Sequence, residues 1–168
     1  MKSVLRKCSI AVIIVLSLIF SSCVNQNALE FYDAESVIIN GEETDHLHVQ
    51  INRKKVAHVP IIALLTELGF EVVWKDASTA VVSILEKEYV ISLVEKAILS
   101  TDREDGFNYL TAAPGTQYYY CEAVENDIVV DGTTIRSFFF LIDYPYSISI
   151  NVDYKKMTVS IETPNLTT

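Results

Sequence analysis

The chain contains 168 residues, of which 22 are acidic and 13 are basic, so its formal net charge at pH 7 is -9. This balance excludes a general nucleic-acid-binding protein, because such a protein needs a basic face that displaces counterions from phosphates. Half of the residues are hydrophobic by type, and a chain of this length can bury enough surface for one compact domain. We therefore expect one domain, or two small halves that share a core.

Residues 1–22 have the pattern of a secretory signal peptide. Lys2, Arg6 and Lys7 form a positive region, and residues 10–20 form an apolar stretch of the length typical of a signal-peptide core. A transmembrane helix needs about 20 apolar residues, so this stretch is short for a membrane span. Because three of the 13 basic residues lie in this segment, its removal would leave a net charge of -12.

The residues that follow the apolar stretch, Phe20-Ser21-Ser22-Cys23, resemble the lipobox of bacterial lipoproteins. This resemblance implies that Cys23 receives a diacylglyceryl group, becomes the new amino terminus after cleavage, and carries fatty acids such as palmitate. Two or more acyl chains anchor a protein stably in a membrane. The alternative is an ordinary secretory signal that is cleaved nearby. Residues 23–36 are polar and unpatterned, and we expect them to form a lipidated tether.

The cysteine count agrees with a lipid anchor. Cys8 leaves with the signal peptide, so only Cys23 and Cys121 remain in the exported chain. A lipidated Cys23 cannot form a disulfide, and Cys121 would then be a small packed residue in a strand-like stretch. Without lipidation, a Cys23–Cys121 disulfide is the alternative.

Residues 37–99 show the pattern of strands around one short helix. We expect a strand at residues 37–40, and a half-buried strand in which Leu47, Val49 and Ile51 alternate with polar residues. Pro60 suits the first position of a helix. Apolar residues then recur at helical spacing and end before Gly69, which favours a helix end: Ile61, Leu64, Leu65 and Leu68.

A hairpin is predicted after this helix. Val72 and Trp74 share one face of a strand. Trp74 either packs beneath the helix or is exposed, in which case it could serve as a ligand platform. Residues 75–79 favour a turn, residues 80–85 a second strand, and residues 88–94 another strand. Residues 100–115 read as a polar loop with glycine and proline, either functional or simply a connection.

Residues 116–161 repeat this pattern with different residues. A shift of 76 pairs Val59 with Ile135 and Trp74 with Ile150, and a shift of 77 pairs Asp76 with Asp153. The sequence therefore predicts an α+β fold in which an antiparallel β-sheet curls around short helices, built from two pseudo-repeated halves, residues 37–99 and 116–161, with a tail at residues 162–168.

Asn40-Gly41, the Val-Pro-to-Leu-Gly helix with its following strand at residues 59–74, and the strand at residues 81–84 resemble the copper amine oxidase N-terminal-like domain, also called the stalk domain. The similarity spans residues 37–161. This resemblance implies an antiparallel sheet curled around a helix and an extracellular accessory role. It does not imply oxidase chemistry.

No catalytic residue, cofactor or binding residue is predicted. Asn108-Tyr109 resembles part of a quinone-forming sequence, but Leu110 stands where an acidic residue is needed. His46, His48 and His58 are weak candidates for a zinc or copper site, and we expect them instead to be exposed strand histidines that hold no metal. The acidic residues at 102, 104 and 105 lack the spacing of a calcium loop and suit a solvated turn.

The runs Tyr118-Tyr119-Tyr120 and Phe138-Phe139-Phe140 are predicted to belong to the core, although exposed aromatic side chains could stack on sugars. We expect a non-enzymatic lipoprotein on the extracellular face of a bacterial cell membrane, with a stalk-like binding or spacer domain. Its partners would be the membrane, through the lipid anchor, and a cell-wall or protein ligand. The alternatives are a cell-wall glycan-binding module, an enzyme, or a metal-binding surface protein.

Overall fold

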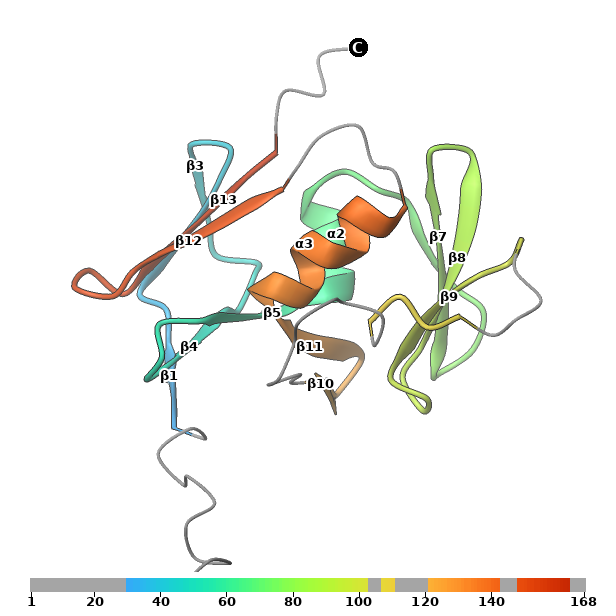
Figure 1. Cartoon of the computed structure of the whole chain (residues 1–168), viewed down its shortest axis with the longest axis horizontal. Helices are drawn as coiled ribbons and strands as arrows, with labels where there is room; N and C mark the ends of the chain where they lie inside the picture. Colours follow the sequence, from blue (N-terminus) through green and yellow to red (C-terminus); the bar gives the residue numbers. More distant parts are fainter. Residues whose placement is uncertain (1–29, 103–106, 111–120, 143–147, 164–168) are drawn as a thin grey trace, which may run out of the picture. The chain divides into compact units, whose positions relative to one another are not determined.

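The computed structural model describes residues 30–102, 107–110, 121–142 and 148–163, which form three β-sheets and two short helices (Figure 1). The chain divides into two units between Glu30 and Phe31, and every described strand and helix belongs to the second unit. The paired strands run antiparallel except for one parallel pair. The structure therefore confirms an α+β fold that is mostly antiparallel β-sheet.

Sheet A has one apolar face and one polar face. Its apolar face carries Ile51, Val59 and Val130, which are fully buried and share a core with buried residues of both helices. Its polar face carries a row of facing residues, because partners across antiparallel strands share a face: Asp33, Gln50, His58 and Asp131. The strands are, in order, β1 (Phe31–Asp33), β4 (Gln50–Asn52), β5 (Ala57–Pro60), β11 (Asp127–Asp131) and β10 (Cys121–Val124).

Sheet B joins segments from both ends of the described chain. Its order is β12 (Ser149–Asp153), β13 (Thr158–Glu162), β2 (Ser36–Ile39) and β3 (Glu42–Thr44). The single parallel pair is formed by β2 and β13, with Ser36 opposite Thr158.

Sheet C contains residues from the first predicted half and Ser100, the first residue of the predicted loop. It is an antiparallel meander of β6 (Val72–Trp74), β7 (Thr79–Ile84), β8 (Lys87–Ser92) and β9 (Ala97–Ser100). Figure 1 shows it in yellow-green, with β7, β8 and β9 labelled. The strands predicted at residues 80–85 and 88–94 are confirmed, whereas β9 was not predicted.

The predicted first helix is confirmed as α2 (Ile61–Glu67). Ile61, Leu64 and Leu65 are buried on its inner face. Gly69 ends the helix with a φ of 85°, a conformation that glycine adopts without steric cost, and the Phe70 N–H then donates to the Leu65 carbonyl at 3.0 Å. Pro60 is the N-cap residue and the last residue of β5, one position earlier than predicted.

Both helices begin at an aspartate of β11. Asp131 is the N-cap of α3 (Gly132–Leu141), and its Oδ1 accepts from the backbone N–H groups of Thr133 and Thr134 at 2.9 and 3.0 Å. Asp127, at the other end of β11, accepts from the N–H groups of Ile62 and Ala63 in α2, both at 2.8 Å. Each carboxylate thus accepts hydrogen bonds from two backbone N–H groups that have no partner within the helix. Such a cap typically stabilises a helix by about 1 kcal/mol.

Aromatic side chains fill the core between α3 and sheet C. Phe138 is fully buried, and its ring meets those of Tyr89 and Tyr109 edge to face, with centroids 5.9 and 6.0 Å apart. Tyr109 and Leu110 are also buried, although the sequence predicts a polar loop there. Asn108 explains the difference, because its Oδ1 accepts from the Ile98 and Leu110 N–H groups and ties this segment to β9.

The two predicted halves are not confirmed as a repeat. Each contains a strand, a helix and a hairpin, but the shift of 76 pairs Val59 of β5 with Ile135 of α3. Sheets A and B also mix segments from both halves. Strand β1 lies within residues 23–36, the predicted tether, so ordered structure begins earlier than expected.

Trp74 is partly exposed at the edge of sheet C. It lies opposite Ala80, which is fully buried, so it shares the inner face of sheet C as expected. However, β6 is an edge strand, and Trp74 keeps 42% of its surface exposed. Of the two positions that the sequence leaves open for Trp74, the structure therefore favours the exposed one, because an edge strand has a neighbouring strand on only one side.

Because Trp74 is exposed and Phe138 is buried, truncation to alanine should reduce the free energy of unfolding less at Trp74 than at Phe138. Phe138→Ala should lower the free energy of unfolding by about 3–5 kcal/mol, as expected for a buried phenylalanine. Trp74→Ala should lower it by only about 1–2 kcal/mol, because less surface is removed from the core. Urea unfolding followed by circular dichroism measures both values. Equal losses would contradict the exposed position of Trp74.

Candidate functional site

The predicted lipidation residue lies outside the described residues. Cys23 belongs to residues 1–29, and its predicted lipidation depends on the sequence pattern alone. Cys121 begins β10, as the strand-like composition around it predicts. No helix among residues 30–102, 107–110, 121–142 and 148–163 is long and apolar enough to cross a membrane.

The three histidines occupy two different environments. His46 and His48 are exposed and precede β4, and Nε2 of His46 lies 3.4 Å from Oδ1 of Asp45. His58 is in β5 and is only 3% exposed. The prediction of three exposed strand histidines is therefore right for the exposure of His46 and His48 and for the strand position of His58. It is wrong in two respects, because His46 and His48 lie outside the strand and His58 is buried in sheet A.

All three histidines nevertheless line one hollow of about 430 Å³, here called the histidine hollow. It lies over the polar face of sheet A, beside the start of α2 and the turn between β10 and β11. None of the described residues that line it is a lysine or an arginine. The other lining residues are Asp33, Gln50, Pro60, Ala63, Val124, Glu125, Asn126, Asp127 and Val129.

The side chain of Asn52 fixes the proton on the His58 ring. Oδ1 of Asn52 accepts from the backbone N–H groups of Lys54 and Val56, at 2.9 and 3.1 Å. The amide therefore directs its Nδ2 group, which can only donate, at Nε2 of His58, 2.9 Å away. Nε2 must accept this hydrogen bond, so the neutral imidazole carries its proton on Nδ1.

Burial changes the acid–base properties of two residues in the hollow. Desolvation lowers the pKa of His58 from its usual value of 6.5, and the Asp131 carboxylate opposes this shift. Desolvation also raises the pKa of Asp127, against the effect of the backbone N–H groups of Ile62, Ala63 and Ile128. Burial therefore favours the neutral form of the His58 imidazole.

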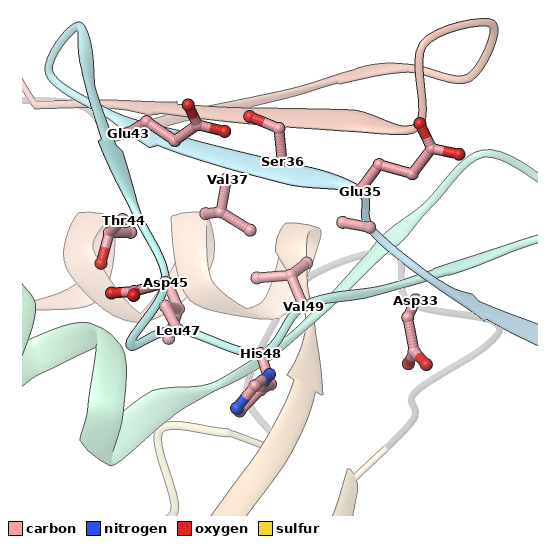
Figure 2. A pocket seen from close by; sticks show the side chains of 11 residues that line it. Asp33, Glu35, Ser36, Val37, Glu43, Thr44, Asp45, Leu47, His48 and Val49 are labelled. Atoms are coloured by element: carbon pink, nitrogen blue, oxygen red, sulfur yellow. The ribbon is translucent and has the colours of Figure 1, made fainter.

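A second hollow, of about 560 Å³, lies beside the histidine hollow and shares Asp33 and His48 with it. Figure 2 shows apolar side chains of Val37, Leu47 and Val49 within it, and carboxylates around them. The carboxylates belong to Asp33, Glu35, Glu43 and Asp45. Such a lining disfavours anionic ligands.

The arrangement does not assemble a metal centre among the described residues. No three His, Cys, Asp or Glu side chains in this part of the chain are grouped so that they could hold a metal ion. Residues that line the same hollow need not bind the same ion, because zinc ligands must all lie about 2.0–2.3 Å from the metal.

Other sequence candidates have structural explanations or lie outside the described residues. Tyr109 packs in the aromatic core, and Asn108 holds backbone groups. The core prediction for residues 138–140 is right for Phe138 and Phe139, whereas Phe140 is 76% exposed. Residues 104, 105 and 118–120 lie outside the described residues.

Comparison with protein-family models, curated proteins and solved structures finds no match to this chain. The resemblance to the stalk domain therefore stays a prediction.

Sequence reasoning missed Asn52, Asp127 and Asp131. Asp131 stands directly before the apolar periodicity of α3, which is a recognisable N-cap signal. Asp127 binds α2 across a separation of more than 60 residues, and no local pattern reveals such a pair.

We expect the protein to bind neither zinc nor copper tightly. Titration calorimetry and melting temperature, measured on a chain that starts at residue 24 and lacks a histidine tag, should show no stoichiometric binding. That chain retains every described strand and helix. Sub-micromolar binding that disappears in both His46→Ala and His48→Ala would contradict this prediction.

Proposed function

We propose that this protein is a non-catalytic lipoprotein on the extracellular face of a bacterial cell membrane. In this proposal Cys23 carries the lipid anchor, and the domain that begins at Phe31 acts as a stalk-like binding or spacer module. A protein or cell-wall component would be its ligand.

The observation that carries the proposal is the division of the chain between Glu30 and Phe31. The signal-like segment and Cys23 lie on one side of this boundary, and all described strands and helices lie on the other. A folded domain that starts eight positions after the lipobox-like cysteine suits a short anchor. The folded domain can then form without the anchor segment.

The non-catalytic part of the proposal rests on the hollows. Their described lining residues carry carboxylates, imidazoles, amides, hydroxyls and apolar groups, and none of these described residues is a cysteine or a lysine. Ser36 and Thr44 line the second hollow together with His48, but the Thr44 hydroxyl donates to a Glu67 carboxylate oxygen at 3.2 Å and not to an imidazole. Nucleophilic catalysis needs a nucleophile within hydrogen-bond reach of its base.

A cell-wall glycan-binding module is the second candidate, and two exposed aromatic residues favour it. Trp74 on β6 is 42% exposed and Phe140 on α3 is 76% exposed. Sugars bind to exposed aromatic faces through their apolar C–H surfaces, and a tryptophan offers the largest such face. A metal-binding surface protein is less favoured, because the described histidines do not form a metal-binding group.

Co-sedimentation with purified peptidoglycan separates the glycan-binding candidate from the first proposal. If glycans are the ligand, Trp74→Ala or Phe140→Ala should lower the bound fraction several-fold. Val94→Ala is the control, because Val94 is a 77% exposed apolar residue without an aromatic ring. Equal retention of all variants, or no sedimentation of the wild type, would argue against glycan stacking.

The lipid anchor is tested by Cys23→Ala. We expect this variant to move from the membrane fraction to the soluble exported fraction, because the apolar stretch at residues 10–20 is too short to anchor the chain by itself. Cell fractionation and labelling with radioactive palmitate measure the change. Cys121→Ala is the matched control and should leave both the label and the membrane fraction unchanged.

If Cys23→Ala stayed in the membrane and kept its label, the lipoprotein proposal would be wrong. Soluble export of the wild type, without label, would support the ordinary secretory signal instead.

A further inference from the structure

The hydrogen bond between Asn52 and His58 joins the end of β4 to β5 in sheet A. His58 lies in β5, between β4 and β11, with Gln50 and Asp131 as its facing residues. Its ring also meets the ring of Phe31, in β1, edge to face with centroids 4.7 Å apart. The imidazole therefore contacts both the β4–β5 turn and β1.

Strand β1 is an edge strand of three residues that pairs only with β4 among the described strands. Its side-chain contacts include the His58–Phe31 ring contact and two hydrogen bonds. Nε2 of Gln50 donates to Oδ1 of Asp33 at 3.2 Å, and Nε of Arg53 donates to the Tyr32 hydroxyl at 3.3 Å. Short edge strands open at low free-energy cost, because few contacts must break. A change at His58 should therefore affect β1 before it affects the rest of the domain.

Protonation of His58 would place a second donor against the Asn52 amide. The imidazolium carries hydrogens on both nitrogens, so Nε2 could no longer accept from Nδ2 of Asn52. The amide cannot turn round without loss, because its Oδ1 holds the N–H groups of Lys54 and Val56. Either the ring must move away from Asn52 or the β4–β5 turn must open.

We propose that Phe31, Asn52 and His58 form a proton-sensitive latch that holds β1 on sheet A when the imidazole is neutral and releases it when the imidazole is protonated. This inference goes beyond the proposed function and does not depend on lipidation of Cys23. Release frees the three residues of β1, or about 10 Å of extended chain, within the predicted tether. It also opens the edge of β4.

The surrounding charges act in both directions. Asp131 of β11 is the facing residue of His58 and favours the imidazolium, but both of its oxygens already accept hydrogen bonds from the start of α3. Burial favours the neutral ring and is the larger effect on the pKa of His58. The other titratable groups that line the same hollow are Asp33, His46, His48, Glu125 and Asp127.

The sign of the pH dependence follows from the lowered pKa. His58 binds a proton more readily in the released or unfolded form than in the latched form. The stability that the latch contributes is therefore fully present above about pH 6.5. Its stability falls as the pH drops from that value through the lower pKa of the latched form.

Hydrogen exchange followed by mass spectrometry tests the latch on the chain that starts at residue 24. Between about pH 7.5 and about pH 5, after correction for intrinsic exchange rates, protection of the β1 amides should fall about fivefold, the size expected for one lost buried hydrogen bond. Protection in β8 is the internal reference, because sheet C contains no histidine. An equal loss in β8 would indicate global destabilisation and overturn the proposal.

Two variants assign the effect to His58. His58→Gln cannot titrate and should remove the pH dependence of β1, whereas His48→Gln, at an exposed position in the same hollow, should retain it. Persistence of the effect in His58→Gln, or its loss in His48→Gln, would overturn the proposal.

Asn52→Asp gives an independent test that does not require His58 to be replaced. The new carboxylate can keep the Lys54 and Val56 hydrogen bonds and accept from protonated Nε2, so β1 should become better protected at low pH rather than worse. An unchanged response in Asn52→Asp would contradict the latch. In the wild type, nitrogen NMR of the neutral ring should show the proton on Nδ1, and a proton on Nε2 would also overturn it.

Discussion

One strand with an aspartate at each end organises both helices of this domain. Because β11 runs antiparallel to β5, with Val129 opposite Pro60, the start of β11 lies where β5 ends and α2 begins. Asp127 can therefore bind the first N–H groups of α2, and Asp131 binds those of α3 at the other end of the same strand. A one-residue slip in this pairing would turn the Asp127 carboxylate to the other face relative to β5 and away from the start of α2. The register of β11 on β5 thus determines whether α2 is capped, whereas the cap of α3 is local to Asp131.

Local patterns predicted the elements well but not their partners. The strand at residues 37–40, the helix that ends at Gly69 and the hairpin after it follow from apolar spacing and turn residues within short windows. The parallel pairing of β2 with β13 and the contact of Asp127 with α2 depend on residues far apart in sequence. Trp74 shows the consequence, since its face was predicted correctly, but its exposure depends on β6 being an edge strand.

The histidines illustrate the same limit at the candidate site. Alternation in the sequence could suggest that His46 and His48 share a face, but it could not show that His58 is buried or which atom it contacts. Asn52 looks like an ordinary turn residue, and its amide indeed holds the turn through Lys54 and Val56. Its second role, orienting an imidazole, follows from the hairpin geometry that the turn itself creates. The described part of the site is therefore defined by a polar network and not by a cluster of ligands.

The parallel pair in sheet B constrains the order in which the strands of this domain can pair as the chain emerges from its amino terminus. The strand that pairs with β2 begins 122 positions later, at Thr158. If the chain crosses a membrane amino terminus first, β2 emerges with β3 as its near neighbour, while its other edge stays open until β13 has crossed. Such an open edge can pair with another chain, and pairing across a long sequence separation slows folding. An export chaperone that covers strand edges would therefore be most useful to this protein before the last described strand has left the translocation channel.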